Sequence, residues 1–217
     1  MVGTSVGGRQ PKAIIAINRE TGEIRSGQVE TGNEYDYYIL KFGDKKRSTA
    51  ELEKTYYDMA KETGINMMES KLIEVEGAHH FLTRRFDRDA KGKLHTQTLA
   101  AMYPEADTYE KLLMACRKLH LPEVDCQDVY RRLVFNILTN NTDDHNKNFS
   151  FIMDHTGKWR LSPAYDLTYI FNISNAHLEQ MYKGNYHLLA NIDGHNRKLV
   201  IRKDTPPIRV HHTKGIG

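Results

Sequence analysis

Three polar residues near the middle of the chain, Asp143, Asn148 and Asp166, have the types and the spacing that phosphoryl transfer from a nucleotide requires. Asp143 and Asn148 lie in the stretch NTDDHNKN, and Asp166 follows Asn148 by eighteen residues. In phosphotransferases one carboxylate orients the attacking hydroxyl, while an amide and a second carboxylate hold Mg²⁺ against the phosphates. The spacing therefore predicts a phosphoryl-transfer site.

Two other interpretations of this stretch remain open. It could be a polar loop whose acids only cap turns, or a metal-hydrolase site with Asp143, His145 and Asp166 as ligands. Asn148 favours phosphoryl transfer, because a Mg²⁺ ion shared with phosphates uses an amide oxygen well. The histidines near the C-terminus do not indicate a zinc site, because they lack a partnered cysteine or acid cluster; they are His177, His187, His195, His211 and His212.

Upstream residues could bring positive charge to the phosphates. The stretch from Ser5 to Lys12, SVGGRQPK, contains adjacent glycines, whose backbone N–H groups can approach an anion closely. Lys41 ends an apolar strand and could reach a nucleotide, or it could simply extend from the sheet edge into solvent. Glu51 could pair with Lys41 or be an exposed acid at a helix start, and we favour the second interpretation.

In the first part of the chain, the elements that must position these residues are strands with one inserted helix. Apolar residues at positions 52, 56 and 59 predict a helix over 50–63 that ends at Gly64. Strand patterns predict one antiparallel sheet around this inserted helix, with strands over 12–18, 23–27, 36–42, 70–76 and 79–86.

Helices dominate the second part. Apolar faces predict helices over 108–119 and 126–139, and strands over 149–153 and 158–162 then form a hairpin. The candidate acids follow the second helix and the hairpin, so core elements hold both. We therefore expect an α+β, two-lobed architecture with polar groups between the lobes. Beyond about residue 172 the pattern weakens to one weak strand near 197–202, and the composition is typical of partial disorder.

Length and composition exclude several classes of protein. With 217 residues, 39% hydrophobic and 27% charged, the chain suits one globular domain or two small lobes. A membrane span is not expected, because no segment approaches about 20 consecutive apolar residues. Cys116 and Cys126 make no disulfide framework, which favours a reducing, cytoplasmic location. The net charge of +3 does not demand a nucleic-acid partner.

Together these motifs resemble the HipA family of bacterial serine/threonine kinases, the toxins of HipBA-type toxin–antitoxin pairs. The stretches NTDDHNKNFSF and WRLSPAYDL resemble the catalytic and metal-binding core of that family. TSVGGRQPKA resembles its serine-containing glycine-rich loop, YYILKF its lysine strand, and TRRFDR its hinge. The resemblance runs in order from about residue 4 to 172.

The resemblance implies a protein-kinase-like fold with ATP and Mg²⁺ as cofactors. An antiparallel β-rich nucleotide-binding lobe would cover 1–88, a mainly helical catalytic lobe 89–172, and a divergent tail 173–217. Asp143 would be the catalytic base, Asn148 and Asp166 would hold Mg²⁺, and Ser5 would be the autophosphorylated residue. The implied nucleotide site consists of Gly7, Gly8, Arg9, Gln10, Lys12, Lys41, Arg84, Arg85, Phe86, His145, Lys147, Asn148, Tyr165 and Asp166.

The resemblance also implies partners. The substrate would be a protein hydroxyl, with an aminoacyl-tRNA synthetase as the target in known members, and a HipB-like antitoxin would link the protein to DNA indirectly.

Two departures from the family pattern stand out: Arg84 occupies a hinge position that is often acidic in the family, and the helices that complete the second lobe are not evident. We therefore expect an incomplete second lobe, as in a truncated copy or one piece of a split system. The alternatives are an inactive remnant that only binds a partner, or a basic-tailed nucleic-acid binder.

Overall fold

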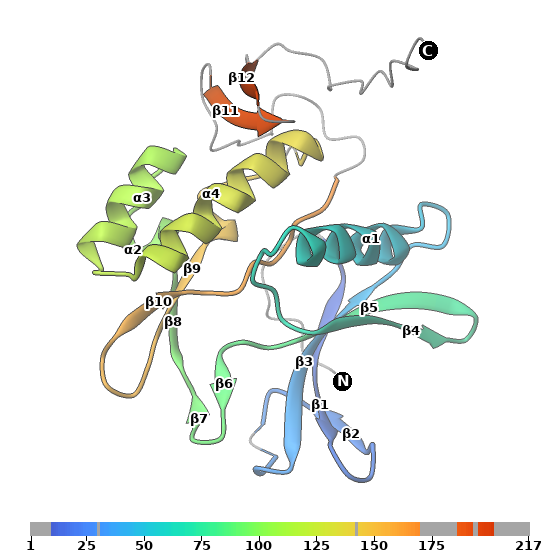
Figure 1. The fold of residues 1–217 in the computed structure, drawn as a ribbon. Helices are drawn as coiled ribbons and strands as arrows, with labels where there is room; N and C mark the ends of the chain where they lie inside the picture. Colours follow the sequence, from blue (N-terminus) through green and yellow to red (C-terminus); the bar gives the residue numbers. More distant parts are fainter. Residues whose placement is uncertain (1–9, 30, 142, 170–185, 193–194, 202–217) are drawn as a thin grey trace.

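The computed structural model describes residues 10–29, 31–141, 143–169, 186–192 and 195–201. Figure 1 shows a larger antiparallel sheet with one helix, and beside it a group of helices with a smaller sheet. This is the mixed α+β architecture that the sequence predicts. The described residues contain no helix that is long and apolar enough to cross a membrane.

The larger sheet has five strands in the order β2-β1-β3-β5-β4, and every neighbouring pair is antiparallel. It confirms the five strands expected in the first part of the chain. Their bounds are β1 (Lys12–Asn18), β2 (Ile24–Ser26), β3 (Tyr35–Phe42), β4 (Ser70–Val75) and β5 (Ala78–Arg84).

The register of this sheet decides which side chains share a face. Lys12 of β1 lies opposite Lys41 of β3, and Lys41 lies opposite Phe81 of β5. Because successive side chains of a strand alternate between faces, these three residues lie on one face of the sheet. The other face carries a small apolar cluster, which is built on Ala13, Ile15 and Leu82.

Helix α1 (Thr49–Glu62) follows β3 and packs against β4 and β5. Its buried positions are Ala50, Glu53, Tyr56 and Ala60, a spacing of three and four residues that places them on one side of the helix. The helix ends just before Gly64, whose φ of 79° suits a glycine at a helix end. Glu53 is the acid among these four residues, and it takes part in the candidate site described below.

The second part of the chain contains the helices α2 (Leu99–Met102), α3 (Tyr109–Lys118) and α4 (Glu123–Leu138). Thr98 and Thr108 cap the first two, since their side-chain oxygens accept hydrogen bonds from the N–H groups of Ala101 and Lys111. The main core lies between α3, α4 and a three-stranded sheet, and it includes Leu112, Val129, Phe149 and Phe151.

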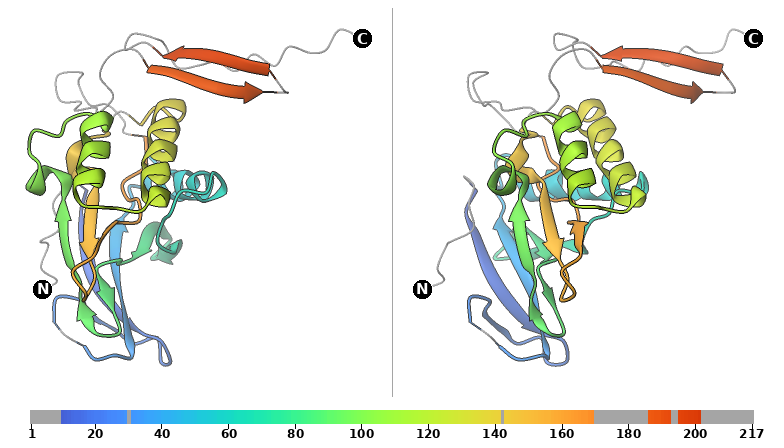
Figure 2. Two further views of the ribbon diagram at one scale, coloured as in Figure 1. Left: turned by 60° about the vertical axis from the view of Figure 1, so that its left-hand side comes forward. Right: turned by 90° about the vertical axis from the view of Figure 1, so that its left-hand side faces the viewer.

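This smaller sheet has the order β10-β9-β8, with bounds β8 (His95–Thr98), β9 (Ser150–Met153) and β10 (Trp159–Leu161). The hairpin of β9 and β10 was expected, but β8, which pairs with the other edge of β9, was not. Two further short strands, β6 (Arg88–Asp89) and β7 (Gly92–Lys93), were also not expected. Figure 2 shows the smaller sheet beside α3 and α4.

In the tail, β11 (Tyr186–Ile192) and β12 (His195–Ile201) form an antiparallel pair. The sequence predicted only the second of these strands. The rest of the expected divergent tail lies outside the described residues.

Candidate active site

Four charged side chains from distant parts of the sequence meet beside the larger sheet, and we call them the charge cluster: Lys12, Lys41, Glu53 and Asp166. The Nζ atom of Lys41 forms an ion pair with Glu53 of α1 and lies 2.5 Å from Oδ1 of Asp166. Lys12, Lys41 and Glu53 are buried. In Figure 1 the segment after β10, which carries Asp166, passes between α4 and α1.

Burial and the neighbouring charges shift the pKa values of the side chains in the charge cluster. Burial alone would lower the pKa of Lys41, but the carboxylates of Asp166 and Glu53 raise it well above its usual value. Burial would raise the pKa of Asp166, yet Lys41 beside it holds that pKa below its ordinary value. The pKa of Lys12 is lowered by burial, which Asp166 offsets only in part. Lys41 and Asp166 are therefore charged at neutral pH.

Glu53, rather than Glu51, is the acid of α1 that pairs with Lys41. The side chain of Glu51 is 42% exposed, and its Oε1 lies 2.7 Å from Nδ1 of His79. The interpretation of Glu51 as an exposed acid at the helix start is thus the correct one. Sequence analysis missed Glu53, although its spacing from Tyr56 and Ala60 places it on the buried side of the helix.

Asp166 has an unusual backbone, with a φ of 54°. Few residues other than glycine adopt this left-handed conformation, and when they do, they are often at functional sites. The preceding residue, Tyr165, donates its hydroxyl to the carbonyl oxygen of Lys147 at 2.9 Å and lies 2.6 Å from Oγ of Ser150. These bonds join the segment of Asp166 to the loop that contains Asn148.

The ring of Tyr165 stacks on that of Phe86, with 5.8 Å between the ring centres. Both residues were predicted nucleotide contacts, and the structure brings them together. Phe86 follows β5, at the connection between the two parts of the fold.

The two adjacent acids of the NTDDHNKN stretch differ in their surroundings. Asp144 is buried and accepts a hydrogen bond at 2.6 Å from the hydroxyl of Tyr109, which itself accepts one from Asn136. Burial raises the pKa of Asp144 to about 7, although the hydrogen bonds from Tyr109 and Asn136 oppose this. The side chain of Asp143 is 33% exposed. Asp143 is therefore the acid of this pair that a substrate can reach.

Local hydrogen bonds fix the loop around Asp143. The backbone N–H of Asp143 donates to Oδ1 of Asn141 at 3.2 Å, and Nδ2 of Asn148 donates to the carbonyl oxygen of Asp143 at 2.9 Å. His145 links the two candidate acids: its Nε2 lies 3.8 Å from Oδ1 of Asp143, and in its protonated form it helps to lower the pKa of Asp166. The loop and the charge cluster thus belong to one site.

Other predicted contacts lie elsewhere. Arg84 pairs with Asp36 at 2.8 Å, on the sheet face opposite to Lys41, and Arg85 forms two hydrogen bonds to Asp87. The structure does not bring these two guanidinium groups to the charge cluster. Gln10 donates to the carbonyl oxygen of Phe42 at 3.2 Å. The remaining predicted residues of the N-terminal loop lie outside the described part of the chain: Ser5, Gly7, Gly8 and Arg9.

The donor atoms fit a hard metal ion with a nucleotide. Asn148 and Asp166 offer an amide and a carboxylate oxygen, the ligand types that Mg²⁺ prefers, and Lys12 and Lys41 offer positive charge for phosphates. Among the described residues, no group of three or more His, Cys, Asp or Glu side chains could hold a metal ion. The hydrolase interpretation with Asp143, His145 and Asp166 as ligands therefore lacks its geometry.

The sequence also matches a known protein family. The HipA-like C-terminal domain matches residues 4–205. The chain belongs to this family. The match extends past residue 172 into the segment that the sequence analysis treats as a divergent tail.

Curated relatives of this family member include a Haemophilus influenzae protein named "Putative kinase", with 27% identity over 187 residues. A second is "Putative kinase Y4dM" of Sinorhizobium fredii, with 28% identity over 150 residues. The matched regions cover 76% and 60% of the present chain, but only 52% and 36% of these relatives. The chain therefore spans about half the length of the first relative and about a third of the second.

Two solved structures share the fold. The HipA–HipB–operator DNA complex of Shewanella oneidensis MR-1 gives a TM-score of 0.57 at 22% identity, covering 76% of this chain and 44% of the matched one. The Helicobacter pylori proinflammatory kinase CtkA gives a TM-score of 0.51 at 15% identity, covering 61% and 50%. These likenesses confirm the expected two-lobed fold class.

Proposed function

We propose that this protein is an ATP- and Mg²⁺-dependent protein serine/threonine kinase of the HipA type. The observation that carries the proposal is the position of Lys41, between a helix acid, Glu53, and the acid Asp166. Protein kinases need a strand lysine that is paired with a helix glutamate, together with an aspartate that holds Mg²⁺. The names of the curated relatives, which contain the word kinase, support the same activity.

Each group of the site has a role in this proposal. The exposed carboxylate of Asp143 would accept the proton of a serine or threonine hydroxyl as it attacks the γ-phosphate. Lys12 and Lys41 would orient the phosphates of ATP through their positive charge. Charge neutralisation at the phosphates would come from Mg²⁺ held by Asn148 and Asp166. The stacked rings of Phe86 and Tyr165 offer an apolar surface for the adenine.

Membership of the family supports further proposals for the substrate and the partners. We propose a protein substrate, with an aminoacyl-tRNA synthetase as the first target to test, and autophosphorylation at Ser5. The Shewanella structure contains HipA with HipB and operator DNA, and this supports a HipB-like antitoxin as a partner. Mass spectrometry after incubation with Mg·ATP tests autophosphorylation at Ser5. Phosphate on Ser5 supports it, and an unmodified Ser5 beside a phosphorylated substrate contradicts it.

Transfer of labelled γ-phosphate to protein tests the activity itself. We expect transfer by the wild type, a loss of roughly 10²–10⁴-fold in Asp143→Ala and a comparable loss in Asp166→Ala. Glu51→Gln is the control, because this acid lies on α1 but outside the charge cluster. Equal phosphate transfer by the wild type and all three variants would contradict the kinase proposal.

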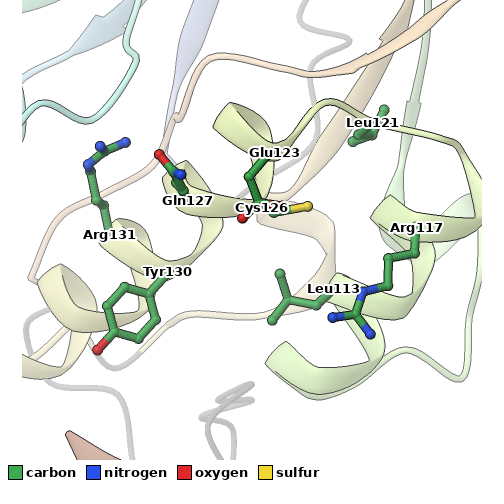
Figure 3. Close-up of a pocket in the computed structure, with 8 residues that line it drawn as sticks. All are labelled: Leu113, Arg117, Leu121, Glu123, Cys126, Gln127, Tyr130 and Arg131. Carbon is green, nitrogen blue, oxygen red and sulfur yellow. The ribbon is translucent and has the colours of Figure 1, made fainter. Parts of the chain in front are cut away.

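A second candidate function is partner binding without catalysis, and a groove between α3 and α4 favours it. The groove has a volume of about 510 Å³, and Figure 3 shows that side chains of both helices line it, among them Leu113, Arg117, Tyr130 and Arg131. Met114, Val124 and Leu138, also on these helices, are exposed. Apolar surface of this kind often contacts another protein. The groove contains no residue of the charge cluster.

Thermal unfolding with and without Mg·ATP separates the two functions. A kinase cleft binds Mg·ATP and raises the unfolding temperature by mass action. A protein that only binds a partner through the α3–α4 groove shows no such shift.

A further inference from the structure

A buried ion pair on α4, Asp128 with Arg132, lies where three segments of the chain meet. Arg132 is fully buried, and its Nε donates to Oδ2 of Asp128 at 2.9 Å. Its Nη2 donates to the carbonyl oxygen of Ser162 at 2.6 Å. On the other side, Oδ1 of Asp128 accepts the backbone N–H of Asn66 at 3.1 Å. The pair therefore binds the loop after α1 with one end and the segment before Asp166 with the other.

These two segments also contact each other directly. The N–H of Ala164 donates to the carbonyl oxygen of Asn66 at 2.7 Å, and Met67 forms a parallel β-bridge with Ala164. Asn66 follows α1, which carries Glu53, and Ala164 precedes Asp166 by two residues. A shift between Asn66 and Ala164 would therefore change the separation of Glu53 and Asp166, the two acids that hold Lys41.

Apolar packing at this junction does not by itself explain the charged pair. Tyr56, Ile65, Phe135 and Leu167 belong to one buried cluster there. A buried ion pair costs desolvation energy, and apolar residues of similar volume often replace one without loss of stability. Nη1 of Arg132 is buried and has no hydrogen-bond partner in the described part of the chain. The pair is thus not optimised for stability alone, whereas its directional bonds fix the geometry of three segments.

We propose that Asp128 and Arg132 are positioning residues that set the place of Asp166 relative to Lys41 and Glu53. They act through Ser162 and Asn66 and contact no nucleotide themselves. The inference rests on the proposed function, because the place of Asp166 matters through the Mg·ATP that it would help to hold. Loss of the pair would leave Lys41 with Glu53 but release the segment that carries Asp166.

A neighbouring ion pair, whose acid lies on the same helix and whose arginine lies on β10, provides a control. Asp125, three residues earlier, accepts hydrogen bonds from Nε and Nη2 of Arg160 at 2.8 and 2.9 Å and from the N–H of Leu161. Like Asp128 it is a buried acid of α4, but the hydrogen bonds of its carboxylate in the described residues go to β10. Asp125→Asn and Asp128→Asn therefore remove the same charge from the same helix, at different junctions.

Hydrogen exchange measured by mass spectrometry on the full chain tests the mechanical part of the proposal. We expect Asp128→Asn to raise exchange in residues 65–67 and 162–167 together, and Asp125→Asn to raise it mainly around 160–161. Faster exchange in only one of the two segments of Asp128→Asn, or in neither, would overturn the proposal. If Asp128→Asn does not fold, Arg132→Lys replaces it, because lysine keeps the charge but cannot hold both Asp128 and Ser162 in the same way.

The Mg²⁺ affinity, measured by thermal shift at a fixed ATP concentration, tests the link to the site. Loss of an indirect support of a metal ligand typically costs about 10–100-fold in affinity, and we expect a loss of this size in Asp128→Asn but none in Asp125→Asn. Equal affinities in the two variants would overturn the positioning role. A wild type that binds no Mg·ATP would refute the proposed kinase instead, and the exchange experiment would still decide whether the pair couples the two segments.

Discussion

Lys41 and Asp166 are 125 residues apart in the sequence, yet the Nζ of Lys41 lies 2.5 Å from Oδ1 of Asp166. The same nitrogen pairs with Glu53, so one cation of the sheet holds an acid from α1 and an acid from the second part of the fold. This contact joins the two parts of the molecule at the place where a nucleotide would bind.

Lys41→Met should destabilise the protein, because it leaves Glu53 buried without its cation. Breaking a buried pair by removing one partner costs about 3–5 kcal/mol. Adding Glu53→Gln should recover part of this loss, because the orphaned charge disappears. Urea denaturation of the wild type, both single variants and the double variant measures the coupling free energy. If the stability lost in the double variant equals the sum of the losses in the two single variants, the side chains of Lys41 and Glu53 are not coupled.

Glu53→Gln should impair phosphoryl transfer, whereas Glu51→Gln should not. The neutral amide holds Lys41 less firmly, and a displacement of about 1 Å at a reacting site can cost about 10²-fold in rate. The rate of γ-phosphate transfer at saturating Mg·ATP is the measurement. Because the two acids are only two residues apart on α1, equal losses in both variants would mean that Glu53 has no special role.

The buried acid Asp144 should make stability depend on pH. Its pKa is about 7 in the folded protein, mainly because of burial, against 3.8 for an ordinary aspartate. Between these values the folded protein keeps a proton that the unfolded chain has lost. Its contribution to stability is therefore complete below about pH 4 and is lost as the pH rises through 7.

Asp144→Asn cannot ionise and should escape this loss. The free energy of unfolding of Asp144→Asn, relative to that of the wild type, should increase by up to about 1.4 kcal/mol per pH unit between pH 4 and 7. Urea denaturation at pH 5 and pH 7.5 measures the two differences. A constant difference would mean that Asp144 is ionised throughout, like an exposed carboxylate.

Gly43→Ala tests the packing directly after the strand of Lys41. A Cβ atom at Gly43 would lie 2.2 Å from the carbonyl oxygen of His79, and backbone there cannot move aside cheaply. Overpacking of this kind costs about 1–3 kcal/mol. Gly157→Ala is the comparison: a Cβ there meets no atom within 4 Å, and only its positive φ opposes the change. Thermal unfolding of both variants should show the larger loss for Gly43→Ala, and the reverse order would contradict the packing at β3.

Local patterns in the sequence predicted most elements of the fold. The runs of apolar and aromatic residues in β1 and β3 and the helical spacing in α1 and α4 depend on neighbours a few residues away, so they can be read without a structure. Asp143 and Asp166 were singled out by residue type and spacing, and their roles stay a prediction. The short strand β8 was missed, since His95–Thr98 is polar and becomes a strand only by pairing with β9.

Features that depend on distant contacts were not predictable in the same way. The choice between Glu51 and Glu53 turns on which side of α1 is buried. The sequence pattern placed that side on Leu52, Tyr56 and Met59, and of these only Tyr56 is among the buried positions of the helix. Arg84 was expected near the adenine, but strand alternation puts its side chain on the face that carries Asp36. The burial of Asp144 depends on Tyr109, 35 residues away. The contact between Asp144 and Tyr109 has no local signal in the sequence.

Binding of ATP to the full chain, measured by calorimetry with and without Mg²⁺, tests the central claim most directly. The charge cluster predicts that the wild type binds ATP, that Mg²⁺ strengthens this binding, and that Asp166→Asn loses the Mg²⁺-dependent part while it keeps its fold. ATP binding that is absent in the wild type, or that is unchanged by Mg²⁺ and by Asp166→Asn, would contradict the account.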